Sequence, residues 1–187
     1  MLCVGRLAAE KNLELALLAF EAIRREQPRA RLVLVGEGPL CDALAQRAPY
    51  LHFAGPRRGV DLAAHYASAD LFLFPSPTGA SGDPTAQALA SALPVVALDH
   101  AAAAPLIRPG IEGMLVPCGN ADEFVRAMLQ NARSAAHHRA LGERARQRAL
   151  QHDWKAVIAR FEFELMRASL QTEAPPWRGA GIASALP

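Results

Sequence analysis

Residues 52–76, HFAGPRRGVDLAAHYASADLFLFPS, contain a complete strand–helix–strand unit. The first apolar run ends at Gly55, a helical pattern covers 60–69, and an almost unbroken apolar run fills 70–76. Runs of that kind are typical of strands buried on both faces, as the strands of a parallel sheet are. The stretch therefore predicts parallel strands joined by a helical crossover.

The same alternation of apolar runs and helical patterns extends through most of the chain. It predicts an α/β fold, a Rossmann-like parallel sheet with helices on both faces. Asn12 and Asp83 are each expected to cap a helix, and Tyr66 is expected to pack at the surface or edge of its helix. The predicted strands lie at 2–5, 30–39, 51–55, 70–76, 93–99 and 113–119, and the predicted helices lie near 13–23, 39–48, 60–69, from 83 onward, and at 121–132, 136–150 and 153–170.

The composition predicts one globular domain at residues 1–170, followed by a Pro/Gly/Ala-rich, flexible tail at 171–187. Hydrophobic residues make up 51% of the 187-residue chain and charged residues 20%, which favours a globular protein over a disordered one. The formal net charge of +2 is too small to favour nucleic acid as a partner. No apolar run approaches the roughly 20 residues of a membrane span.

The three cysteines, Cys3, Cys41 and Cys118, form no pair with the spacing of a metal site. They favour a reduced chain with buried thiols, and hence a cytoplasmic location without a metal centre.

The loops that follow the predicted strands hold the candidate binding residues, because ligands of such folds bind beyond the carboxyl ends of the strands. Arg6 and Lys11 precede the first helix, where two cations suit a diphosphate, although a solvated loop explains them equally well. Gly36 and Gly38 allow either close approach to a ligand or a plain turn.

Taken together, VGRLAAEKNLELALLAF, ARLVLVGEGP, the opening stretch and ALASALPVVALD resemble the C-terminal, donor-binding domain of retaining GT-B-fold glycosyltransferases, the glycosyl transferases group 1. The resemblance covers about residues 2–165 and is closest to GDP-mannose-dependent α-mannosyltransferases. It implies one half of a two-domain enzyme that transfers a hexose or mannose from a nucleotide diphosphate sugar, with GDP-mannose as the expected donor. No cofactor or obligatory metal is implied.

The resemblance also assigns roles to individual residues. It places Arg6, Lys11 and Gly82 at the donor diphosphate, and it places a second group at the nucleoside and ribose: Gly36, Glu37, Gly38, Arg57 and Gln87. It identifies no confident catalytic residue.

The chain departs from the family pattern on the side of the donor sugar. Gly79 and Gln87 stand at the positions of two glutamates, and Pro105 stands at the position of a later one. Losing several charge-assisted hydrogen bonds would weaken donor binding by about 3–6 kcal/mol. The sugar-binding motif is therefore expected to be degenerate, with Gly79 as its main lost contact.

Two hypotheses follow. The chain is either the donor half of a glycosyltransferase, completed by a separate N-terminal Rossmann-like half, or a non-catalytic, degenerate or truncated module that binds nucleotide weakly or binds a protein partner. A strand that begins almost at residue 1 suggests that a further segment precedes it. The isolated chain is expected to be inactive, and a lipid-linked acceptor would bring it to a membrane surface.

Overall fold

The computed structural model describes residues 1–78, 83–100, 103–133, 135–151, 162–163 and 166–167. Residues 1–150 form one compact unit and residues 151–187 a second. In the second unit only Gln151 and short helical pieces at 162–163 and 166–167 are described, so the fold below is that of the first unit. The domain boundary at residue 170 stays a prediction.

A single parallel sheet of six strands forms the centre of the first unit, with the order β3-β2-β1-β4-β5-β6. All neighbouring strands run parallel, which confirms the predicted fold class. The strand order reverses direction between β1 and β4, as in the doubly wound dinucleotide-binding sheet. The strands are β1 (Leu2–Val4), β2 (Val33–Val35), β3 (His52–Gly55), β4 (Phe72–Phe74), β5 (Val95–Leu98) and β6 (Gly113–Val116).

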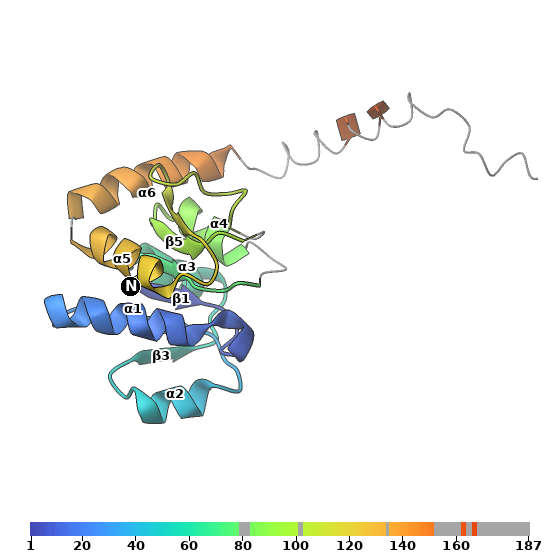
Figure 1. The fold of residues 1–187 in the computed structure, drawn as a ribbon. Helices are drawn as coiled ribbons and strands as arrows, with labels where there is room; N and C mark the ends of the chain where they lie inside the picture. The colour runs from blue at the N-terminus through green and yellow to red at the C-terminus, as the bar shows by residue number, and fades with distance from the viewer. Residues whose placement is uncertain (79–82, 101–102, 134, 152–161, 164–165, 168–187) are drawn as a thin grey trace, which may run out of the picture. The chain divides into compact units, whose positions relative to one another are not determined.

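Helices cover both faces of the sheet, and Figure 1 shows α1 beside α5 and α4 beside α6. The last described element of the unit, α6, follows α5 directly along the chain. The helical elements are η1 (Ala9–Lys11), α1 (Leu13–Glu26), α2 (Cys41–Arg47), α3 (Gly59–Ala67), α4 (Asp83–Ala90), α5 (Ala121–Ala132) and α6 (Ala135–Leu150).

Alternate side chains of each strand enter two separate hydrophobic clusters. In β4 and the residue before it, Leu71 and Leu73 belong to the cluster under α1, α2 and α5, whereas Phe72 and Phe74 belong to the cluster under α3, α4 and α6. Every residue of β4 and of β5 is buried. The unbroken apolar runs in the sequence therefore reflect strands that face hydrophobic helices on both sides.

The start of α1 differs from the sequence prediction. Asn12 precedes the helix as expected, but its side chain makes no capping hydrogen bond. Instead Asn12 adopts φ 50° and ψ 45°, a left-handed conformation that asparagine tolerates better than most residues. Its role is to turn the chain from η1 into α1, and Lys11 consequently lies at the end of η1.

Tyr66 is buried in the core, so the predicted position at the surface or edge of its helix is wrong. The side chain is 2% exposed, and the ring centroid lies 5.6 Å from that of Phe72. Its hydroxyl donates a hydrogen bond to the carbonyl of Pro84 over 3.2 Å. Tyr66 thus joins α3 to the first turn of α4.

In the described part of the chain, no helix is both long enough and apolar enough to cross a membrane.

Replacing Tyr66 with alanine should lower the free energy of unfolding by about 3–5 kcal/mol, because a buried aromatic ring is lost. His65→Ala on the same helix is the matched control and should change stability by less than about 0.5 kcal/mol, because its ring lies nearer the surface. Urea denaturation of the full chain measures both values. Similar small effects of the two substitutions would contradict the packing role of Tyr66.

Candidate functional site

The candidate site lies where the carboxyl ends of β1 and β4 diverge. The reversal of strand order at this point leaves a crevice, because the crossovers on its two sides leave the sheet in opposite directions. A small hollow opens there, and the residues that line it include Gly5, Arg6, Lys11, Phe74, Pro75 and Ser76. The hollow therefore collects residues from two segments about 70 positions apart in the sequence.

One wall of the crevice is made by two loops whose backbones touch. The N–H of Gly5 donates to the carbonyl of Val35 over 2.9 Å, and the N–H of Leu7 donates to the carbonyl of Glu37 over 2.8 Å. These bonds hold the loop after β1 against the loop after β2. Main-chain hydrogen bonds on both sides consequently fix the backbone of Arg6.

Gly36 and Gly38 are required by this contact. A Cβ at Gly36 would lie 1.9 Å from the carbonyl oxygen of Gly5, and a Cβ at Gly38 would lie 2.4 Å from that of Leu7. Both glycines are thus explained by backbone packing, which favours the turn over ligand approach as the reason for the GEG sequence. Their contact with a nucleoside stays a prediction.

The two cationic side chains, Arg6 and Lys11, lie at the edge of the crevice. The guanidinium of Arg6 lies 3.9 Å from the carboxylate of Glu10, and its side chain is 68% exposed. An exposed pair at that distance contributes little to stability, so Arg6 is available to an incoming anion. The Cε of Lys11 approaches Gly5, with 3.9 Å to where a Cβ would be.

Two hydroxyl groups tie the loop after β4 to η1. Ser76 is 2% exposed, and its Oγ donates to the carbonyl of Glu10 over 3.1 Å and also contacts the carbonyl of Thr78. Thr78 Oγ1 donates to the same Glu10 carbonyl over 3.2 Å. Because Lys11 is the next residue, these bonds fix the backbone from which its side chain extends.

The sequence analysis assigned no role to Ser76 or Thr78 and missed these hydrogen bonds. A serine that directly follows a fully buried strand was the available signal, because a buried hydroxyl needs a partner.

The other predicted residues occupy neighbouring positions or fall outside the description. Glu37 belongs to the loop after β2, and Arg57 is exposed after β3, two strands from β1, or about 10 Å along the sheet. Gln87 is exposed on α4, on the β4 side of the crevice. Gly79 and Gly82 lie outside the described residues, and so does the side chain of Asp83.

The structure changes the interpretation of the cysteines. Only Cys3 is buried, while Cys41 is half-buried and Cys118 is exposed. Burial raises the pKa of the Cys3 thiol to about 12, although the charge of Lys11 acts in the opposite direction. Cys3 therefore lies beneath the crevice as a neutral, apolar group.

Among the residues that the structure describes, no three His, Cys, Asp or Glu side chains gather as a metal site would require.

Comparison with known families and proteins gives a consistent result. The model of the family described as glycosyl transferases group 1 matches residues 1–134. A GDP-mannose-dependent alpha-mannosyltransferase of Mycolicibacterium smegmatis is 34% identical over 90% of this chain and 44% of its own length. The sulfoquinovosyl transferase SQD2 of Arabidopsis thaliana is 30% identical over 89% of this chain and 33% of its own length. The chain thus spans less than half the length of these relatives.

Solved structures share the fold. A mutant of S. aureus TarM, in complex with Fondaparinux, alpha-GlcNAc-glycerol and UDP, gives a TM-score of 0.78 at 18% identity and covers 88% of this chain and 35% of its own. The C-terminal domain of a group 1 glycosyl transferase, LpcC of Francisella tularensis, gives 0.73 at 16% identity and covers 81% of this chain and 84% of its own.

Gly36→Ala should destabilise the fold by more than about 4 kcal/mol or prevent folding, because the new Cβ cannot avoid the Gly5 carbonyl. Gly119→Ala is the matched control, because Gly119 also has positive φ but has no atom within 4 Å of the position that a Cβ would take. The control should cost only about 1–2 kcal/mol of left-handed strain. Thermal unfolding compares the two variants, and equal losses would show that the loop contact is not decisive.

Cys118 should react with a thiol reagent and Cys3 should not. With a pKa of about 12, only about one in 10,000 Cys3 thiols is ionised near pH 8. Mass spectrometry after alkylation of the native chain locates the label, and alkylation in denaturant provides the control. Rapid labelling of Cys3 in the native chain would contradict its burial.

Proposed function

Because the chain belongs to the glycosyl transferases group 1 family, we propose that it is the donor-binding half of a retaining glycosyltransferase. The observation that carries the proposal is the meeting of Arg6 and Lys11 at the point where the strand order reverses. The donor would be a nucleotide diphosphate sugar, and GDP-mannose is the first choice because several relatives are named as GDP-mannose-dependent mannosyltransferases.

The proposed chemistry is stabilisation of a leaving diphosphate. As the bond between the sugar and the diphosphate breaks, negative charge grows on the diphosphate, and fixed cations beside it lower the barrier. Arg6 and Lys11 would supply these cations. Ser76 would keep Lys11 in place through the Glu10 carbonyl, and the braced loops after β1 and β2 would keep Arg6 in place.

The nucleoside would extend from the diphosphate along the carboxyl edge toward β2 and β3. Glu37 and Arg57 follow these two strands, so their loops lie at the same carboxyl edge of the sheet as the loop that carries Arg6. Gln87 would approach from α4 and accept one hydrogen bond from the ribose, because an amide oxygen lacks the second acceptor of a carboxylate. The proposed ribose contact is therefore weaker than that of a relative with glutamate.

A complete reaction would need a second, N-terminal Rossmann-like half that binds the acceptor. The 187-residue chain alone is therefore expected to transfer no sugar. A cytoplasmic location is proposed together with this function, and a lipid-linked acceptor would bring the protein to the membrane surface.

The non-catalytic module is the second candidate. It is favoured by the amide side chain of Gln87 and by the lack of a side chain at Gly79. Both replace the carboxylates that the family pattern has at these positions. This alternative predicts nucleotide binding without discrimination between GDP and GDP-mannose.

Titration calorimetry with GDP, UDP and GDP-mannose tests the proposal. Arg6→Ala with Lys11→Ala should weaken diphosphate binding by about 100- to 10,000-fold, because two charge-assisted contacts of about 1.5–3 kcal/mol each are lost. Arg47→Ala is the control, since Arg47 pairs with Glu14 over 2.6 Å on the surface. It should leave affinity unchanged.

The affinity of the unchanged chain should also fall with added salt, because exposed charges are screened. Equal affinity of the double variant and the unchanged chain would show that the diphosphate is held elsewhere.

A further inference from the structure

A second and larger hollow lies at the opposite edge of the sheet from the candidate site. Its lining includes Leu2, Val33 and Leu71, which lie at or next to the first residues of β1, β2 and β4. Because these strands are parallel, their first residues share the amino edge of the sheet, and the hollow is here named the amino-edge cavity. Its volume is about 630 Å³, a size that is typical of small-molecule sites.

Two connections that enter the sheet at this edge leave the cavity between them. Residues 27–32 enter β2 from α1, and residues 68–71 enter β4 from α3. The two helices cover opposite faces of the sheet, because Ile23 of α1 belongs to one hydrophobic cluster and Tyr66 of α3 belongs to the other. The cavity is therefore a consequence of the strand order, as the crevice at the carboxyl edge is.

The lining of the amino-edge cavity combines an apolar part with charged groups. Leu2, Ile23 and Leu71 are each 1% exposed and form part of the protein core. Arg29 and Arg31 line the same cavity but are exposed residues. A mainly apolar wall with a small number of charged groups is the usual composition of a site for a small molecule.

Hydrogen bonds hold the turn that carries the two arginines. The N–H of Gln27 donates to the carbonyl of Ile23 over 2.8 Å, and the N–H of Ala30 donates to the carbonyl of Gln27 over 2.9 Å. Gln27 Nε2 donates to the carbonyl of Ala132 over 2.7 Å and so connects the turn to the end of α5. Arg31 Nη1 donates to the carbonyl of Ala30 over 3.1 Å. The cationic side of the cavity is therefore built on a fixed backbone.

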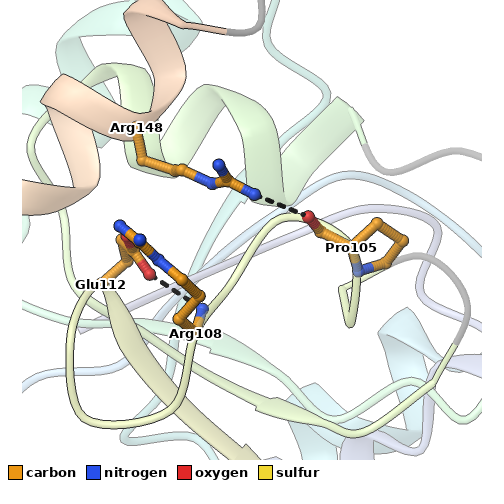
Figure 2. A network of polar contacts seen from close by, with 4 residues as sticks. All are labelled: Pro105, Arg108, Glu112 and Arg148. Atoms are coloured by element: carbon orange, nitrogen blue, oxygen red, sulfur yellow. Dashed lines mark hydrogen bonds and ion pairs between the residues drawn. The ribbon is translucent and has the colours of Figure 1, made fainter.

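A different group of charges, near the end of α6, already has its partners within the protein. Glu112 is 0% exposed and accepts hydrogen bonds from the N–H of Arg108 over 2.8 Å and from Arg108 Nε over 2.9 Å. Arg108 Nη2 forms an ion pair with the same carboxylate, and Arg148 Nη2 donates to the carbonyl of Pro105 over 3.4 Å (Figure 2). Glu112 is thus compensated where it lies and offers nothing to a ligand.

The charges around the amino-edge cavity are not compensated in this way, and they favour an anion. Arg29 makes no hydrogen bond or ion pair with any residue that the structure describes, and Arg31 uses only Nη1, toward main-chain carbonyls. Asp70 is the one carboxylate among the described residues of the lining. Burial lowers the pKa of His138, although the Asn131 backbone and Asp70 act in the opposite direction, so its ring is mostly neutral at pH 7.

We propose that the amino-edge cavity binds an organic anion with an apolar body. The apolar body would contact Leu2, Ile23 and Leu71, and the anionic group would meet the guanidinium groups of Arg29 and Arg31. The inference does not rest on the proposed function, because a nucleotide sugar would bind at the other edge of the sheet. A ligand in this cavity would contact the ends of α1 and α3 together and would stabilise the folded chain by mass action.

Fluorescence titration of the full chain with anilinonaphthalene sulfonate, an apolar anion, tests the proposal. The unchanged chain should bind a single molecule of this probe. Arg29→Gln combined with Arg31→Gln should weaken its binding by about 5- to 30-fold, because charge-assisted contacts at an exposed position are lost. The same double variant should leave the binding of N-phenylnaphthylamine, a neutral probe with the same apolar body, unchanged. Arg25→Gln, at an exposed arginine of α1 outside the cavity, is the matched control for charge.

A second set of variants locates the bound probe. Ala64→Phe places a ring at the cavity and should weaken both probes by about 10-fold or more, because the volume available to them falls. Ala63→Phe is its matched control, since Ala63 is also exposed on α3 but does not line the cavity. Asp70→Asn removes a like charge and should tighten the sulfonate by about 2- to 5-fold without affecting the neutral probe.

Three results would overturn the cavity as the site: no binding of the sulfonate, equal affinity in Ala64→Phe and the unchanged chain, or displacement of the sulfonate by GDP. The last result would place the probe in the donor crevice. Equal affinity for the sulfonate in the double arginine variant and the unchanged chain would overturn the anionic class of the ligand. If the chain binds no nucleotide, the proposed function fails, whereas the Ala64→Phe and arginine results still decide this inference.

Discussion

The contact between the loops after β1 and β2 is the constraint on which the site depends. The two backbones approach so closely that a hydrogen atom fits at Gly36 and a methyl group does not. Main-chain bonds from Gly5 and Leu7 then fix the loop that carries Arg6 and leads into η1. A ligand that meets this wall therefore meets a surface formed before binding, and little ordering of the loop remains to be done.

The remainder of the site is organised around this wall from the other side of the strand reversal. Ser76 and Thr78 share the carbonyl of Glu10 and so connect the β4 loop to η1. Tyr66 connects α3 to the start of α4 through Pro84. Farther along the sheet, Arg108 and Arg148 converge on Glu112 and Pro105. Ser76, Thr78, Tyr66 and Arg148 each donate to a carbonyl of another segment, and Arg108 pairs with Glu112 within its own segment. These bonds hold the loops without depending on a bound ligand.

The fold could be predicted from the sequence because its strands are nearly unbroken apolar runs. A run such as 70–76 predicts a strand that is buried on both faces. The convergence of Arg6 and Lys11 was predictable from their place after the first strand. The reason for Gly36 and Gly38 could not be predicted. A Cβ at Gly36 would lie 1.9 Å from the Gly5 carbonyl oxygen only because the loops after β1 and β2 lie side by side, and the order of the strands does not follow from local sequence patterns. Tyr66 and Asn12 were misjudged for a related reason: burial and left-handed conformation are set by tertiary contacts. Glu112 gave no signal, because an arginine four residues before a glutamate usually indicates a helical surface.

The strand order also determines how this sheet can fold as it is synthesised. β1 is the first of the six strands to leave the ribosome, but one of its two neighbours is β4, and Leu2 pairs with Phe72. At about 5–20 residues per second, β1 waits about 4–14 s for that partner. The strand is almost wholly apolar. During this interval one of its edges can pair with β2, while the opposite edge, which later pairs with β4, has no partner strand from this sheet. Of the paired strands, β1 and β4 are the farthest apart in the sequence, so the reversal of strand order that creates the crevice also leaves the unpaired edge of β1 exposed for the longest time during synthesis. Protection by a chaperone matters most during that interval.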